Sequence, residues 1–182
     1  RHRIWQKIIF QIFCNIRFYN LDCFALNWFN NFIIGDNMKI CIFDYDETLI
    51  LGETPKGETL SAFYRRNTFL NNLFYKKTNL VKLAKEEKAK GNLIVICTAR
   101  EKRFSLKAVL FLKGIPCDVL IERAKGDITP TGLLKQKQIL QLIISNNDYI
   151  FADKDFYDDN QENLDKVSMI NNVKVYDAKR LA

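Results

Sequence analysis

KICIFDYDETL, residues 39–49, joins a short apolar run to a dense group of polar side chains. The run 39–43 is rich in β-forming residues, which predicts a buried strand. Asp44 and Asp46 follow it directly. Carboxylates at i and i+2 at the end of a strand point to the same side, so these two can share one substrate.

Four more apolar runs recur along the chain, with longer segments of helical spacing between them. Alternating strands and helices predict an α/β fold, with a parallel sheet, right-handed crossovers and helices on both faces. The predicted strands are 39–43, 93–97 (LIVIC), 119–121, 149–152 (YIFA) and 173–176, and the predicted helices are 67–90, 101–113, 132–145 and 160–170.

Polar side chains directly follow four of the five predicted strands. In a parallel sheet, ligands bind at the carboxyl ends of the strands. These side chains therefore predict one active-site rim. After Asp44 and Asp46 come Thr98, Ala99 and Arg100, then Glu122 and Arg123, then Asp153 with Asp155, Asp158 and Asp159.

These residue types suit phosphoryl transfer. Asp44 can attack phosphorus to give an acyl-phosphate, while Asp46 protonates the leaving oxygen and later activates water. Crowded carboxylates need a balancing cation, which predicts Mg²⁺ with ligands from the later acidic cluster. Thr98 offers a hydroxyl and the following backbone amides to the phosphate, and Lys135 offers a positive charge. Lys137 is an alternative, but it falls on a different helix face.

FDYDETL (43–49), CTAR (97–100), the Lys of LLKQK (133–137) and ADKDFYDDN (152–160) resemble the four ordered motifs of the haloacid dehalogenase (HAD) superfamily. The resemblance covers residue 38 to about residue 178. It implies a Rossmann-like three-layer sandwich with a central parallel sheet and a minimal cap or none, and an Mg²⁺-dependent phosphatase. The residue roles that it implies are Asp44 as nucleophile and metal ligand, Asp46 as acid/base and carbonyl metal ligand, Thr98, Ala99, Arg100 and Lys135 as phosphate binders, and Asp153 or Asp158 as metal ligand.

The last motif leaves its metal ligand open. Asp153 is favoured, with Asp158 assisting, because YIFA is the better strand. Asp155 and Asp159 fit a solvated turn or a helix start.

The short spacing between motifs predicts an open site, which suits bulky substrates. Residues 121–140 resemble the phage polynucleotide kinase 3′-phosphatase domain and related phage phosphatases, with Arg123, Gly126, Asp127 and Lys135 as counterparts. Nucleic acid ends are therefore one expected substrate. Arg100, Arg103, Arg123 and Lys125 could hold backbone phosphates, or be scattered surface charges. A small-molecule or nucleotide phosphatase, a protein phosphatase of DxDxT type and a non-catalytic binding domain of the same fold are alternatives.

Composition fits one globular domain. The chain has 182 residues, a net charge of +7 and a pI near 9.1, which favours acidic partners. Its five cysteines lack CxxC spacing, which indicates a reducing, cytoplasmic compartment. The oligomeric state does not follow from the sequence.

The first 37 residues are crowded with Ile, Phe and Asn and are excluded from the catalytic domain, 38–182. They have neither the cleavage site of a signal peptide nor an apolar run long enough to span a bilayer, so no membrane partner is expected. Two interpretations of this segment stay open. Either Met38 is the true start and the preceding residues are translated upstream sequence, or the segment is a peripheral amphipathic helix.

Overall fold

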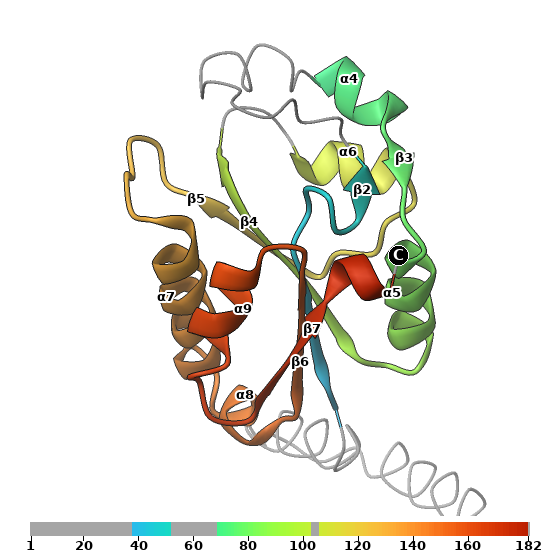
Figure 1. Ribbon diagram of the computed structural model, residues 1–182. Helices are drawn as coiled ribbons and strands as arrows, with labels where there is room; N and C mark the ends of the chain where they lie inside the picture. Colours follow the sequence, from blue (N-terminus) through green and yellow to red (C-terminus); the bar gives the residue numbers. More distant parts are fainter. Residues whose placement is uncertain (1–37, 52–68, 103–105, 182) are drawn as a thin grey trace, which may run out of the picture. The chain divides into compact units, whose positions relative to one another are not determined.

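A five-stranded parallel sheet organises the residues that the structure, a computed structural model, describes: 38–51, 69–102 and 106–181 (Figure 1). The strand order is β5-β4-β1-β6-β7. The predicted N-terminal extension, 1–37, lies outside the described residues. The sheet strands are β1 (Ile40–Phe43), β4 (Leu93–Glu101), β5 (Val119–Arg123), β6 (Lys154–Asp158) and β7 (Val173–Asp177).

Helices cover both faces of this sheet because the side chains of its strands alternate between two apolar cores. Cys41 and Phe43 of β1 face one core, and Ile40 and Ile42 face the other. The first core contains α5 (Leu80–Ala89) and α6 (Leu106–Leu112), and the second contains α7 (Thr131–Ile144) and α9 (Gln161–Val167). The predicted α/β three-layer fold is confirmed.

Smaller elements complete the described part. Strands β2 (Ile50–Leu51) and β3 (Lys76–Lys77) form an antiparallel pair beside α4 (Phe69–Phe74). Helix α8 (Asn147–Phe151) precedes β6, and a 3₁₀ turn, η1 (Ala178–Arg180), follows β7. None of the described helices has the length and apolar character needed to span a bilayer.

The predicted strand at 149–152 is wrong, because these residues lie in and just after helix α8. Asn146 caps this helix by accepting a hydrogen bond from the Asp148 amide at 3.0 Å, a start signal that outweighs the β-rich composition. The strand comes later, as β6, and reaches Asp158. The carboxyl end of this strand is therefore Asp158 and not Ala152.

The predicted single helix over 67–90 is also wrong in its described part, where α4, β3 and α5 follow one another. Thr78 interrupts the helical spacing, because its amide and its hydroxyl donate to the carbonyls of Leu49 and Thr48, at 3.0 and 2.5 Å. These bonds tie the start of α5 to the loop after β1. The predicted helices 132–145 and 160–170 correspond to α7 and the shorter α9. Of the described residues in 101–113, Glu101 ends β4 and Leu106–Leu112 form α6.

A network of charged side chains lies at the amino end of the sheet. Lys39 Nζ lies 2.7 Å from Asp155 Oδ2 and 3.5 Å from Glu87 Oε2. Glu87 also accepts hydrogen bonds from Lys90 and Asn92, each at 2.6 Å. Burial alone would raise the pKa of Glu87, but these donors and the charge of Lys39 lower it. The ionised form of Glu87 therefore stabilises the fold.

Candidate active site

Asp44 stands at the carboxyl end of β1, the central strand of the sheet. Its amide donates to the carbonyl of Tyr157 at 2.9 Å, which extends the pairing of β1 with β6 by one residue. The side chain is only 7% exposed. Burial raises the pKa of Asp44, Lys135 opposes this effect, and the carboxylates of Asp158 and Asp46 add to it.

Lys135 reaches Asp44 from helix α7 on the second face of the sheet, as the sequence predicted. Its Nζ lies 2.7 Å from Asp44 Oδ1 and 2.5 Å from Asp158 Oδ2. Burial lowers the pKa of Lys135, but the two carboxylates outweigh burial and raise it, so the ammonium stays charged. Lys137, the alternative, is exposed on the same helix.

Three carboxylates meet at this point. Asp44, Asp158 and Asp159 each offer an oxygen within 4.8 Å of the others. Burial and the neighbouring Asp158 raise the pKa of Asp159, while Lys179 lowers it. If all three carboxylates are ionised, the ammonium groups of Lys135 and Lys179 leave one negative charge uncompensated. An all-oxygen group with this charge suits a hard divalent cation such as Mg²⁺.

Asp153, favoured by the sequence as a metal ligand, is at the other end of the sheet. It precedes β6, and its carbonyl accepts a hydrogen bond from the amide of Ile40, the first residue of β1, at 2.8 Å. The choice of Asp153 was wrong because it followed from the misplaced strand at 149–152. Asp158, predicted only to assist, takes the position at the carboxyl end, and Asp159 joins it.

Asp46 does not point into the three-carboxylate group but binds Arg100. Arg100 Nε lies 2.6 Å from Asp46 Oδ2, and Arg100 Nη2 binds Asp46 Oδ1. Burial lowers the pKa of Arg100, and the charge and hydrogen bonds of Asp46 outweigh burial and raise it. Arg100, predicted to bind phosphate, is thus paired with the predicted acid/base.

Thr98 and Ala99 lie on β4, which continues beyond its predicted end to Glu101 through an irregular register. Thr98 is 1% exposed, and its hydroxyl accepts a hydrogen bond from the Arg100 amide at 3.2 Å. The carbonyl of Ala99 accepts a hydrogen bond from Arg123 Nε at 2.8 Å. These bonds fix the chain at the edge where the sequence predicts a phosphate.

Arg123 holds the loop 124–130 in place. Its Nη1 donates to the carbonyls of Asp127 and Thr129 at 2.9 and 2.7 Å, and Nη2 to the Thr131 hydroxyl at 3.4 Å. Arg123 was predicted to bind substrate, and in the structure its guanidinium positions the loop that leads into α7 and Lys135. Arg103, the other predicted substrate contact, lies outside the described residues.

Two asparagines belong to the site although the sequence did not suggest them. Asn163 Nδ2 donates to both Asp158 oxygens, at 3.0 and 3.1 Å, and thereby orients that carboxylate. Asn72 Oδ1 accepts a hydrogen bond from Arg100 Nη1 at 2.9 Å. Asn163 could have been suspected from the sequence, because it lies on the helix that follows the acidic cluster. Asn72 could not, because 28 residues separate it from its partner Arg100.

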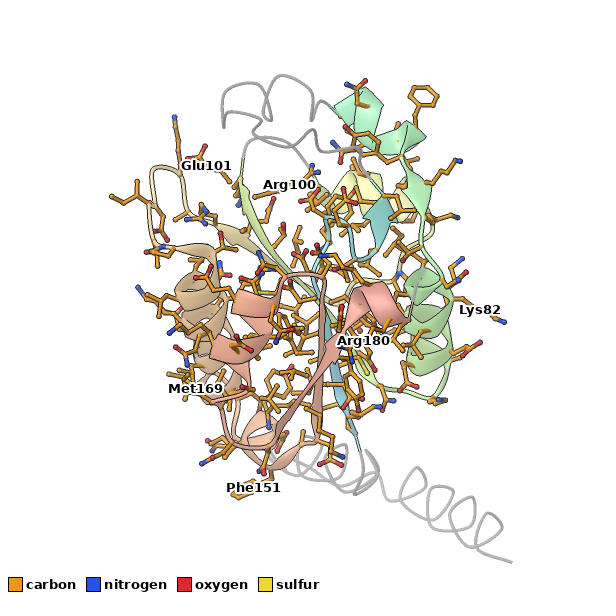
Figure 2. The ribbon with its side chains drawn as sticks, in the orientation of Figure 1. Lys82, Arg100, Glu101, Phe151, Met169 and Arg180 are labelled. Atoms are coloured by element: carbon orange, nitrogen blue, oxygen red, sulfur yellow. The ribbon has the colours of Figure 1, made fainter. Side chains whose placement is uncertain are left out.

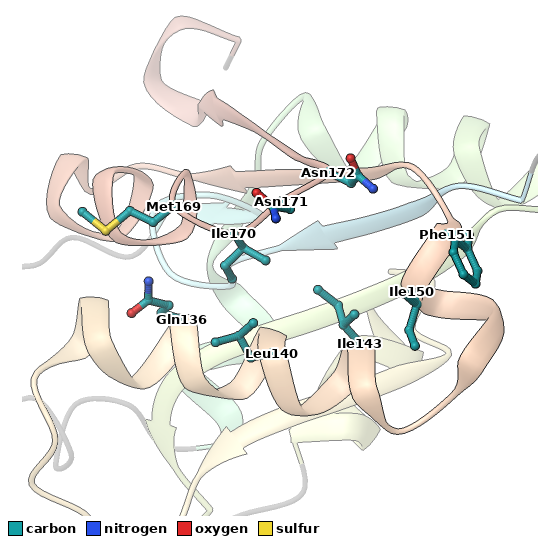
Figure 3. Close-up of a pocket in the computed structure, with 9 residues that line it drawn as sticks. All are labelled: Gln136, Leu140, Ile143, Ile150, Phe151, Met169, Ile170, Asn171 and Asn172. Atoms are coloured by element: carbon teal, nitrogen blue, oxygen red, sulfur yellow. The ribbon is translucent and has the colours of Figure 1, made fainter.

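A pocket of about 490 Å³ lies elsewhere, between α7, α8 and the turn after α9 (Figure 3). Its walls include the apolar side chains of Leu140, Ile143 and Ile150. None of the predicted site residues lines it. Phe151 and Met169, two of its residues, lie toward the opposite end of the described domain from Arg100 (Figure 2).

Fold and site together define a Rossmann-like α/β protein with its polar residues at the carboxyl end of the central strand. More narrowly, the fold is HAD-like. Comparison with family models and with curated proteins gives no match. Two solved structures of the Pnkp1/Rnl/Hen1 complex, one described as an RNA repair complex, each match with a TM-score of 0.60 and 18% identity.

These matches cover 78% and 90% of this chain, and 45% of the neighbouring chain in both. This chain therefore spans less than half the length of those neighbours. A HAD-superfamily hydrolase of subfamily IA, variant 1, from Geobacter sulfurreducens matches with a TM-score of 0.53 and 10% identity. That match covers 77% of this chain and 88% of the hydrolase. At these identities the likeness is one of fold.

Proposed function

We propose that this chain is an Mg²⁺-dependent phosphomonoester hydrolase that acts through an aspartyl-phosphate on Asp44. The observation that carries the proposal is the buried contact of Asp44 with Lys135, at 2.7 Å, beside Asp158 and Asp159. A nucleophilic carboxylate needs a cationic partner that also attracts a phosphate, and Lys135 meets both needs.

The reaction has two displacements at phosphorus. In the first, an Asp44 carboxylate oxygen bonds to phosphorus as the ester P–O bond breaks. The electron pair of that bond goes to the leaving oxygen, which takes a proton from the Asp46 carboxyl. In the second, water attacks phosphorus and gives its proton to Asp46, and the bond between Asp44 and phosphorus breaks. Inorganic phosphate leaves, and both carboxyl groups return to their starting forms.

The residues present fit an Mg²⁺ ion. Asp44, Asp158 and Asp159 would hold it, with the backbone carbonyl of Asp46 as a further oxygen ligand. When bound, Mg²⁺ supplies positive charge that neutralises the carboxylates and the substrate phosphate. Asn163 and Lys135 keep Asp158 oriented toward this group.

A 3′-phosphorylated nucleic acid end is the substrate class that we propose. The net charge of +7 favours a polyanion. The stretch 121–140 resembles phage 3′-phosphatases, and its loop is fixed by Arg123 at the rim of the site. Two neighbours in fold come from structures of the Pnkp1/Rnl/Hen1 complex, which is consistent with this class. Exposed lysines on this rim, Lys102 and Lys125, would contact backbone phosphates.

The test is Mg²⁺-dependent phosphate release by the full chain from a 3′-phosphorylated oligonucleotide, a mononucleotide and p-nitrophenyl phosphate. Asp44→Asn should abolish release from all three. An oligonucleotide preference that declines with salt would support the nucleic acid substrate. Activity on the small substrates alone would indicate a general phosphatase. If no substrate gives release that depends on Asp44, the catalytic proposal fails and a non-catalytic binding domain becomes the better account.

Metal binding has a separate readout that does not require turnover. Mg²⁺ should raise the melting temperature of the parent chain, because a ligand that binds only the folded state stabilises it. Asp158→Asn should weaken this rise, whereas Asp153→Asn, at the amino end of β6, should keep it. Equal behaviour of the two variants would contradict the assignment of Asp158 as a ligand.

A further inference from the structure

The guanidinium of Arg100 joins two side chains that are far apart in sequence. On one side its Nε and Nη2 bind the Asp46 carboxylate. On the other side its Nη1 donates to Asn72 Oδ1 at 2.9 Å. The same Asn72 oxygen accepts a hydrogen bond from the Tyr45 hydroxyl at 3.3 Å, and Arg100 Cζ lies 4.9 Å from the centre of the Tyr45 ring.

The residues that Arg100 joins differ in how far they are exposed to solvent. Asn72 and Tyr45 are 0% exposed and Arg100 is 4% exposed, whereas the Asp46 side chain is 28% exposed. Buried polar groups in a hydrogen-bond network hold one geometry. Asp46 is thus the member of this group that can meet substrate, and Asn72 is a buried member that holds Arg100 from the other side.

Helix α4, which carries Asn72, is itself held in place. Lys113, just after α6, donates its ammonium to the carbonyls of Leu73 and Tyr75, at 3.0 and 2.6 Å. These bonds satisfy carbonyls at the end of α4, where no helical partner follows. The position of Asn72 is therefore set by α6 as well as by Arg100 and Tyr45.

We propose that Asn72 is a positioning residue for proton transfer by Asp46, acting through Arg100; this rests on the proposed function. Both Asp46 oxygens are bound by Arg100, so Asp46 has to release at least one contact, and carry a proton on the freed oxygen, before it can protonate the leaving oxygen. Asn72 keeps the guanidinium in place during that release. Asp46 then returns to the same position to accept the proton of the attacking water.

This role predicts a dependence on the leaving group. An alcohol oxygen, as in a nucleic acid 3′-phosphate, needs the proton from Asp46 as the P–O bond breaks. The p-nitrophenolate ion leaves readily without one. Proton transfer by a positioned side chain contributes about 10²- to 10⁴-fold in rate, and a misplaced acid loses part of that factor. Loss of Asn72 should therefore slow alcohol release much more than phenolate release.

The experiment compares kcat/KM of the full chain for a 3′-phosphorylated oligonucleotide and for p-nitrophenyl phosphate, because kcat/KM covers the steps up to release of the leaving group and not the later hydrolysis that both substrates share. Asn72→Ala should lower the first about tenfold or more and the second less than about twofold. Asn147→Ala, an exposed asparagine on helix α8, is the control and should change neither. Asn72→Asp keeps an acceptor oxygen and should restore the parent ratio of the two rates.

Equal losses on both substrates in Asn72→Ala, or no loss on the oligonucleotide, would overturn the proposal. If Asn72→Ala is not recovered folded, Asn72→Leu, which fills the volume without an acceptor, is measured in its place. Failure of the proposed function looks different, since Asp44→Asn would then match the parent on every substrate.

Discussion

Replacing Lys135 by methionine would remove the ammonium that binds the buried carboxylates of Asp44 and Asp158. Lys135 is 1% exposed, and its partners are 5% and 0% exposed. Removal of one partner from a buried ion pair costs about 3–5 kcal/mol, because the remaining charge is left without compensation. In the absence of Mg²⁺ we expect Lys135→Met to lose this much unfolding free energy, or about 6–20 °C in melting temperature for a domain of this size.

Urea denaturation in EDTA and in Mg²⁺ measures this effect. The loss should shrink in Mg²⁺, because the ion supplies positive charge to the same carboxylates. Lys137→Met, two residues further along the same helix, is the exposed control and should change stability by about 0.5 kcal/mol or less. Equal stability of Lys135→Met and the parent in EDTA would refute the view that Lys135 compensates buried charge.

Two further changes test the parts of the fold that support the site. Arg123→Ala should cost about 1–2 kcal/mol in urea denaturation and speed amide hydrogen exchange in residues 124–130; Arg123→Lys should not restore protection, because lysine lacks the guanidinium fork. Unchanged exchange in that loop would contradict its anchoring by Arg123. Glu87→Gln should cost about 2 kcal/mol at neutral pH. Because the pKa of Glu87 is lowered on folding, its contribution is complete above its ordinary value of 4.5 and disappears as the pH falls through the lower folded value. Urea denaturation as a function of pH checks this, and a loss that persists at low pH would show that the charge of Glu87 is not its source.

The central strand and its first carboxylate could be predicted because both depend on local sequence. Residues 40–43 are apolar on both faces of the strand, as a strand between two helical layers requires, and Asp44 follows at once. Lys135 was predicted from its order among the motifs, and the regular spacing of α7 placed it on the buried face.

Strand β6 could not be predicted, because the partners that allow its charged residues to be buried are seen only in the fold. Lys154 is 1% exposed and donates to the carbonyls of Ile150 and Ala152, at 3.2 and 2.6 Å. Asp155 is 5% exposed and binds Lys39, 116 residues away. In the sequence KDFYD (154–158) is polar and YIFA (149–152) is apolar, so the strand was predicted at the apolar run. In the fold Phe151, from that run, is 85% exposed, and tertiary pairing has reversed the local pattern.

Charge balance distinguishes the two buried ionic groups at opposite ends of the sheet. At the amino end, Lys39 and Lys90 face Glu87 and Asp155, so positive and negative charges are equal in number. At the carboxyl end, three carboxylates face the ammonium groups of Lys135 and Lys179, so one negative charge is in excess. Burying uncompensated charge opposes folding, so a balanced group can persist for stability alone, whereas an unbalanced one needs a ligand of opposite charge. The same reasoning that makes Glu87 structural therefore makes Asp44 and Asp158 the place where a cation and a phosphate are expected.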